Sequence, residues 1–90
     1  MKTLDTHQQL FAITAEECGE LVQVCMKILR KAQVDDEWNA KLLEEAGDVY
    51  CMLDLMVQHG YLTWDDITKR SSVKKSKLMK WSDLIPNKKD

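Results

Sequence analysis

The sequence predicts an all-α fold, in which a hairpin of two long helices is followed by a third long helix. Two observations carry this prediction. Apolar residues recur at intervals of three and four along most of the 90-residue chain, which is the spacing that places side chains on one face of an α-helix. The chain also contains only three Gly and one Pro, so few positions favour the turns that a β-rich fold requires.

The first helix is predicted over residues 3–31. Its apolar positions at helical spacing are Leu4, Phe11, Cys18, Leu21, Cys25 and Ile28. The stripe is centred on the last three of these residues. The segment Val34-Asp35-Asp36 then interrupts the pattern, and either aspartate can act as the N-cap of the next helix.

A second helix is predicted over residues 37–59 and a third over residues 63–81. The apolar stripe of the second helix consists of Trp38, Leu42, Val49, Leu53 and Met56. Gly60 follows at a position typical of a helix C-terminus, and Thr63 precedes the third helix as a residue that favours the N-cap. One domain is expected over residues 1–82, with a C-terminal tail at residues 83–90.

The two long helices of the hairpin have wide apolar faces. A chain of 90 residues is near the lower end of what one hydrophobic core stabilises well. The helices can bury these faces fully only against another copy of the chain. A homo-oligomer of the four-helix-bundle type is therefore expected.

The composition excludes several classes of function. No apolar run approaches the ~20 residues that a bilayer requires, and the start of the chain, Met1-Lys2-Thr3-Leu4-Asp5, lacks the apolar core of a signal peptide. Three cysteines without an export signal favour reduced thiols and a cytoplasmic location. A formal net charge of −2 does not favour general binding to nucleic acid. We expect neither a membrane nor a nucleic acid as a partner.

Two pairs of acidic residues occupy unusual positions around the predicted helices. With an advance of about 100° per residue, Glu17 falls within the apolar stripe of the first helix and Glu20 falls at its edge. Glu45 and Asp48 repeat this arrangement on the second helix. Glu16 and Glu44, which directly precede the two pairs, point toward solvent. Each helix thus places two carboxylates, three residues apart, at the margin of its buried face.

Four carboxylates beside a buried face need a partner of opposite charge. An ionised carboxylate without a partner is costly to bury, or it shifts to its neutral form. One interpretation pairs the acids, as surface groups, with Lys27 or Lys41. Because no Lys or Arg occupies the intervening buried positions, a hard divalent cation such as Mg²⁺, which prefers oxygen ligands, is the favoured partner.

The two acid pairs belong to the motifs Glu16-Glu17-Cys18-Gly19-Glu20 and Glu45-Ala46-Gly47-Asp48. This arrangement resembles the MazG-like all-α nucleoside triphosphate pyrophosphohydrolases, whose signature is Glu-Glu-x-x-Glu on one helix and Glu-x-x-Asp on the next. Similar flanking segments are Ile13-Thr14-Ala15, Val49-Tyr50 and the lysine-rich Ser76-Lys77-Leu78-Met79-Lys80-Trp81. The last of these is similar to the final helix of small, phage-type members.

The resemblance implies a hydrolase of nucleotide metabolism that converts a (deoxy)nucleoside triphosphate to the monophosphate and pyrophosphate. It implies Glu17, Glu20, Glu45 and Asp48 as ligands of Mg²⁺, with Mn²⁺ as a substitute. Glu16 would then be a supporting catalytic acid, and Glu20 is a candidate for accepting the proton of the attacking water. Members of the family form dimers or tetramers built on four-helix bundles, so a homodimer or a homotetramer is implied.

Four basic residues are candidates for binding the phosphates of the substrate. Lys27 and Arg30 follow the first motif by two to three helical turns, and Lys74 and Lys77 lie on the third helix. Arginine offers a planar fork of donors to phosphate, whereas lysine offers a point charge. The base, the sugar and the choice between a normal nucleotide, a damaged nucleotide and an alarmone stay open.

Two alternative functions also stay open. A phosphoribosyl-ATP pyrophosphatase-like enzyme shares the acid motifs, but Tyr50-Cys51 stands here where that enzyme has Tyr-His. A non-catalytic helical oligomerisation or regulatory module shares the fold, but such a module has no need of four acids beside its core. The ability to bind a divalent cation separates this module from an enzyme.

Overall fold

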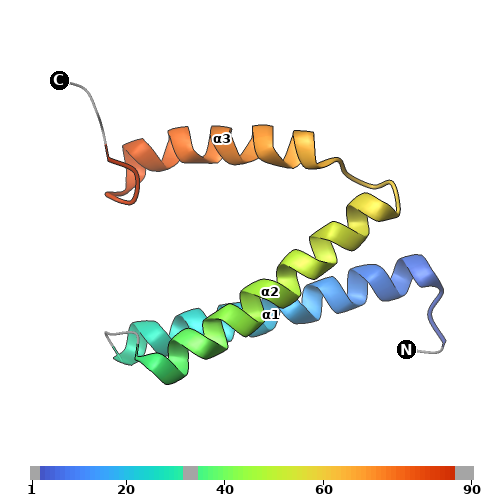
Figure 1. The fold of residues 1–90 in the computed structure, drawn as a ribbon, viewed down its shortest axis with the longest axis horizontal. Coiled ribbons are helices and arrows are strands. Elements are labelled where there is room, and N and C mark those ends of the chain that lie inside the picture. Colours follow the sequence, from blue (N-terminus) through green and yellow to red (C-terminus); the bar gives the residue numbers. More distant parts are fainter. Residues whose placement is uncertain (1–2, 32–34, 87–90) are drawn as a thin grey trace. The chain divides into compact units, whose positions relative to one another are not determined.

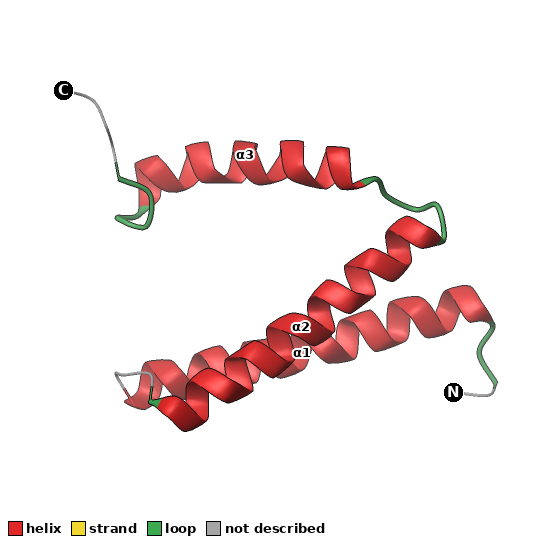
Figure 2. Ribbon diagram, viewed as in Figure 1, coloured by secondary structure: helices red, strands yellow, loops and turns green. Residues whose placement is uncertain are grey.

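The computed structural model describes residues 3–31 and 35–86. Three helices account for most of them: α1 (Thr6–Lys31), α2 (Asp36–Gln58) and α3 (Trp64–Trp81). No strand occurs among the described residues (Figure 1 and Figure 2). The all-α prediction is confirmed. Val34 and the last four residues of the predicted tail lie outside the described residues.

The chain divides into two compact units, Met1–His59 and Gly60–Asp90. The first unit contains the α1–α2 hairpin, in which the two helices run antiparallel and side by side (Figure 1). The second unit contains α3. The extent of a single domain over residues 1–82 stays a prediction.

Short-range hydrogen bonds define where α1 and α2 begin. At α1, the Gln8 N–H donates to the Asp5 carboxylate at 2.8 Å and the Asp5 N–H donates to the Gln8 side-chain oxygen at 3.0 Å, which is a reciprocal capping box. Helix α1 therefore starts at Thr6, three residues later than predicted. At α2, the Asp35 carboxylate accepts the Trp38 N–H at 2.9 Å, so the first of the two candidate aspartates is the N-cap.

Asp35→Ala should lower the free energy of unfolding by about 1 kcal/mol, because the Trp38 N–H loses its acceptor. Urea denaturation followed by circular dichroism measures this change. Asp36→Ala is the matched control, since Asp36 lies in the first turn and its effect on the helix dipole is worth only a few tenths of a kcal/mol. Equal losses in the two variants would contradict the assignment of Asp35 as the N-cap.

Gly60 and Thr63 form the connection between α2 and α3 as predicted. Gly60 has a φ of 83°, in the left-handed region that glycine adopts without a steric penalty. It follows His59, the C-cap of α2. The Thr63 hydroxyl accepts the Asp66 N–H at 3.1 Å, which satisfies one of the free N–H groups at the start of α3.

The core of the hairpin is small. Leu10, Met52 and Met56 form one buried cluster, with Ile13, Leu53 and Leu55 packed against it. Val24 is buried further along α1. The charged residue Glu45 is also buried, with 5% of its surface exposed. The contact between α1 and α2 is thus interrupted by an acid.

The face of α1 that contacts α2 differs from the predicted stripe. Cys18 and Cys25 are exposed and Phe11 is 47% exposed, whereas Leu10 and Val24 are buried. Helix α1 carries apolar residues on two adjacent faces. Periodicity shows which residues share a face, but both faces have the same period, so it does not show which of them meets α2.

Helix α3 has a different character. It has no buried residue, and its residues from Lys69 to Lys80 include six basic and no acidic side chains. Within residues 3–31 and 35–86, no helix has an apolar stretch long enough to cross a bilayer.

Candidate metal centre

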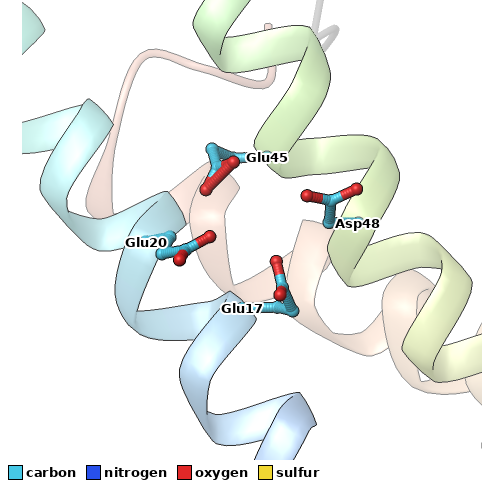
Figure 3. Close-up of side chains that lie close together, drawn as sticks. All are labelled: Glu17, Glu20, Glu45 and Asp48. Carbon is cyan, nitrogen blue, oxygen red and sulfur yellow. The ribbon is translucent and has the colours of Figure 1, made fainter.

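The four acids predicted as a group lie together between the two helices of the hairpin. Glu17 and Glu20 extend from α1, Glu45 and Asp48 extend from α2, and their carboxylates point toward one another (Figure 3). A spacing of three residues places each pair on one face of its helix. Antiparallel packing of α1 on α2 then brings the two pairs together.

The distances within this cluster suit a divalent cation. One carboxylate oxygen from each of the four residues lies within 4.8 Å of the other three. Oxygens bound to a single Mg²⁺ lie at most about 4.2 Å apart, because each Mg–O bond is about 2.1 Å long. Adjacent oxygens in an octahedron lie closer still, at about 3.0 Å, so the side chains have to draw together before all four oxygens bind one ion.

Burial leaves part of the cluster without a partner. Glu45 is buried and Glu17 is half-buried, whereas Glu20 is exposed. The Oε2 atom of Glu17 is inaccessible to solvent and accepts no hydrogen bond, which is a costly state for a carboxylate oxygen. Lys69 is paired with Asp65, and no described lysine or arginine forms an ion pair with any of the four acids. A bound cation would give the buried Glu17 oxygen a partner and would neutralise the charge of the four acids.

The crowded carboxylates also perturb one another's protonation. A hydrogen bond with Glu20, followed by burial and by the charges of Glu20 and Asp48, raises the pKa of Glu45 to about 7. Burial first, and then the same two neighbouring charges, raises the pKa of Glu17. Near neutral pH the cluster therefore tends to retain a proton. A divalent cation that replaces this proton allows all four carboxyl groups to ionise.

The other predicted site residues lie in different places. Glu16 is exposed on α1, as its position in the helical repeat predicts. Lys27 borders the acids, as described below, whereas Arg30 is exposed near the end of α1. Lys74 and Lys77 belong to α3, in the second unit of the chain.

A cavity of about 280 Å³ adjoins the acids on the side of the hairpin that faces the α1–α2 connection. Its walls include Glu20, Val24 and Lys27 from α1, and Trp38, Lys41 and Glu45 from α2. Glu20 and Glu45 are thus shared between the cavity and the carboxylate cluster. The sequence predicts Lys41 only as an alternative partner for the acids. The signal that could have found the cavity is the spacing of Trp38, Lys41 and Glu45, which places all three on one helix face.

No protein-family model, curated protein or solved structure matches this chain. The resemblance to MazG-like enzymes therefore depends on the two acid motifs and their flanks. Fold and site together define the chain as an all-α hairpin with four converging carboxylates at its centre.

Proposed function

We propose that this protein is a Mg²⁺-dependent nucleotide pyrophosphohydrolase of the MazG-like type, which hydrolyses a nucleoside triphosphate to the monophosphate and pyrophosphate. The observation that carries the proposal is the convergence of four carboxylates from two helices within 4.8 Å. A purely structural cluster of this kind would be unfavourable, because one of its oxygens is buried without a partner and no lysine or arginine within residues 3–31 and 35–86 is paired with it.

The residues present fit this chemistry. Glu17, Glu20, Glu45 and Asp48 would hold Mg²⁺, which supplies neutralisation of phosphate charge and a lowered pKa for bound water. Glu20 is exposed and lines the cavity, which supports it as the group that accepts the proton of the attacking water. The water oxygen forms a bond to the α-phosphorus. The bond from that phosphorus to the bridging oxygen breaks, and pyrophosphate leaves.

Basic side chains stabilise the charge that develops on the leaving phosphates. Lys27 lines the cavity next to Glu20 and Glu45, and it is the predicted phosphate ligand nearest to the acids in sequence. Arg30 lies one turn further along α1. Phosphate binding by Lys74 and Lys77, on α3, stays a prediction, as does the supporting role of Glu16.

Hydrolysis is tested by product analysis of a panel of ribo- and deoxynucleoside triphosphates, incubated with Mg²⁺ or with EDTA. We expect nucleoside monophosphate and pyrophosphate in a 1:1 ratio, with Mg²⁺ only, because the carboxylate cluster needs the cation to position substrate and water. Mn²⁺ should replace Mg²⁺. Nucleoside diphosphate with orthophosphate would place the attack at the wrong phosphorus, and equal rates in EDTA would refute the metal site.

The proposed active form is a homo-oligomer. On α1, residues 11, 15, 18, 22, 25 and 29 form an exposed stripe spaced by four and three, with Val22 60% and Leu29 68% exposed. On α2, Leu43 and Tyr50 belong to a similar stripe and are 74% and 61% exposed. Each stripe lies one residue after the positions that contact the other helix. Because the helices are antiparallel, this offset places both stripes on the same side of the hairpin.

Such a two-helix apolar face matches the surface that a second hairpin would cover in a four-helix bundle. Leu43→Glu should therefore shift the protein from a dimer or tetramer toward the monomer, because a carboxylate would be buried in the interface. Light scattering coupled to gel filtration measures the molar mass. Ser71→Glu adds the same charge at an exposed position of α3, outside the stripe, and should leave the mass unchanged. An unchanged mass for Leu43→Glu would remove this face from the interface.

A further inference from the structure

We propose that the cavity beside the carboxylate cluster is the subsite for the pyrophosphate half of the substrate, and that it thereby sets the direction in which a nucleoside triphosphate lies along the hairpin. The β- and γ-phosphates would point toward Trp38, and the nucleoside would point toward the core cluster around Met52. The identity of the substrate rests on the proposed function. The wall of the cavity holds three carboxylates, Glu20, Glu44 and Glu45, and two lysines, Lys27 and Lys41. The lysines attract phosphate once Mg²⁺ neutralises Glu20 and Glu45.

The cavity offers donors that lack acceptors. Lys27 and Lys41 both line it, and neither forms an ion pair within the described part of the chain. Trp38 also lines it, and the Trp38 indole N–H is inaccessible to solvent and without a hydrogen-bond acceptor. Two ammonium groups and an unsatisfied N–H beside a polar cavity are suited to the several acceptor oxygens of a phosphate.

The surroundings of Trp38 favour an anion over a stacked base. The Lys27 ammonium lies 5.5 Å and the Lys31 ammonium 5.2 Å from the centre of the Trp38 ring, within the range of cation–π attraction. A base that stacked on this ring would compete with these two cations. A phosphate group instead gains from Lys27 and Lys41, which line the cavity, and from Lys31 over the Trp38 ring.

The direction of the substrate follows from where the basic residues lie along the hairpin. Residues 3–16 and 49–59, which form the part of the hairpin on the core side of the acids, contain no lysine or arginine. The basic residues that the structure describes in the hairpin all lie on the other side of the acids: Lys27, Arg30, Lys31 and Lys41. Since Glu20 and Glu45 belong to both the cluster and the cavity, an α-phosphate at the acids places the β- and γ-phosphates beside these cations.

Binding of pyrophosphate to ¹⁵N-tryptophan-labelled protein in excess Mg²⁺ tests this inference without turnover. The chain has three Trp, and the Trp38 indole resonance is assigned by its loss in Trp38→Phe. We expect pyrophosphate to shift this resonance beyond the shift caused by Mg²⁺ alone. A nucleoside monophosphate should leave it unshifted, because that product would occupy the opposite side of the acids.

Variants sharpen the test. Lys41→Gln should weaken pyrophosphate binding about tenfold, as expected for loss of one charge-assisted hydrogen bond. Lys75→Gln removes the same charge from α3 and should leave the dissociation constant unchanged. Calorimetric titration at one ionic strength compares the two variants. Equal weakening in both would mean a nonspecific charge effect and would overturn the subsite.

The outcomes separate this inference from the proposed function. A Trp38 shift with pyrophosphate in a protein that hydrolyses no nucleotide would support the subsite and reject the enzyme. Hydrolysis to monophosphate and pyrophosphate without any Trp38 shift would support the enzyme and reject the subsite. A shift caused by the monophosphate and not by pyrophosphate would overturn the proposed direction.

Discussion

Glu45→Gln is expected to abolish Mg²⁺-dependent hydrolysis and, at the same time, to make the metal-free protein more resistant to denaturation. Glu45 is buried and faces three other carboxylates. Glutamine has nearly the same shape, carries no charge and can donate a hydrogen bond to Glu20. The substitution therefore removes repulsion from the metal-free cluster, but it also removes an anionic ligand from the metal-bound form.

The expected loss in kcat/KM is more than about 100-fold, because even residues that only orient metal ligands contribute 10–100-fold. Kinetics in saturating Mg²⁺ measure this loss, and thermal denaturation in EDTA measures the stability. Glu37→Gln is the matched control, since Glu37 is an exposed acid in the first turn of α2. The Glu37→Gln variant should keep full activity. It should be slightly less stable, because it loses a negative charge that interacts favourably with the helix dipole at the start of α2. Unimpaired turnover in Glu45→Gln would eliminate the metal-site assignment.

The second large effect concerns pH. In the absence of divalent cations, the free energy of unfolding should fall as the pH rises from about 4.5 to about 7. The pKa of Glu45 is raised from its ordinary value of 4.5 to about 7 in the folded protein. Between these values the folded state binds more protons than the unfolded state, so stability decreases with increasing pH and levels off above 7. The raised pKa of Glu17 acts in the same direction.

Mg²⁺ should reverse this trend, because the cation binds the ionised carboxylates and its affinity increases as they lose protons. At a concentration 100 times its dissociation constant, a ligand adds about 2.7 kcal/mol to the stability of the folded state. Denaturant titrations from pH 4.5 to 8, with EDTA or with Mg²⁺, give both curves. In Glu45→Gln the fall in EDTA should be smaller. A stability in EDTA that increases over this range would show that the acids are not crowded in the folded protein.

Most of the helical structure was predictable from the sequence because it depends on residues close together in the chain. The N-cap roles of Asp35 and Thr63 involve hydrogen bonds over three residues. The end of α2 depends on Gly60, whose positive φ is a property of glycine itself. The predicted start of α1 lies three residues too early, because the mutual hydrogen bonds of Asp5 and Gln8 form a capping box that starts the helix at Thr6.

The candidate site was predictable in part. A spacing of three residues shows that Glu17 and Glu20 share a face, and the same holds for Glu45 and Asp48. That the four carboxylates meet within 4.8 Å depends on how α1 and α2 are aligned along each other. The sequence indicated a shared cation site from the position of both pairs at the margin of the buried face, and the resemblance to known enzymes implied the same four ligands.

The sequence by itself thus determined the helices, their ends and the membership of each helix face, because these follow from local hydrogen bonds and from the 3.6-residue repeat. Tertiary structure alone decided which of the two apolar faces of α1 packs on α2. It also decided that the Glu17 Oε2 atom and the Trp38 N–H are buried without partners, and that Lys27 and Lys41 flank one cavity. These features depend on the rotation and alignment of one helix against another, which side-chain packing between distant residues sets.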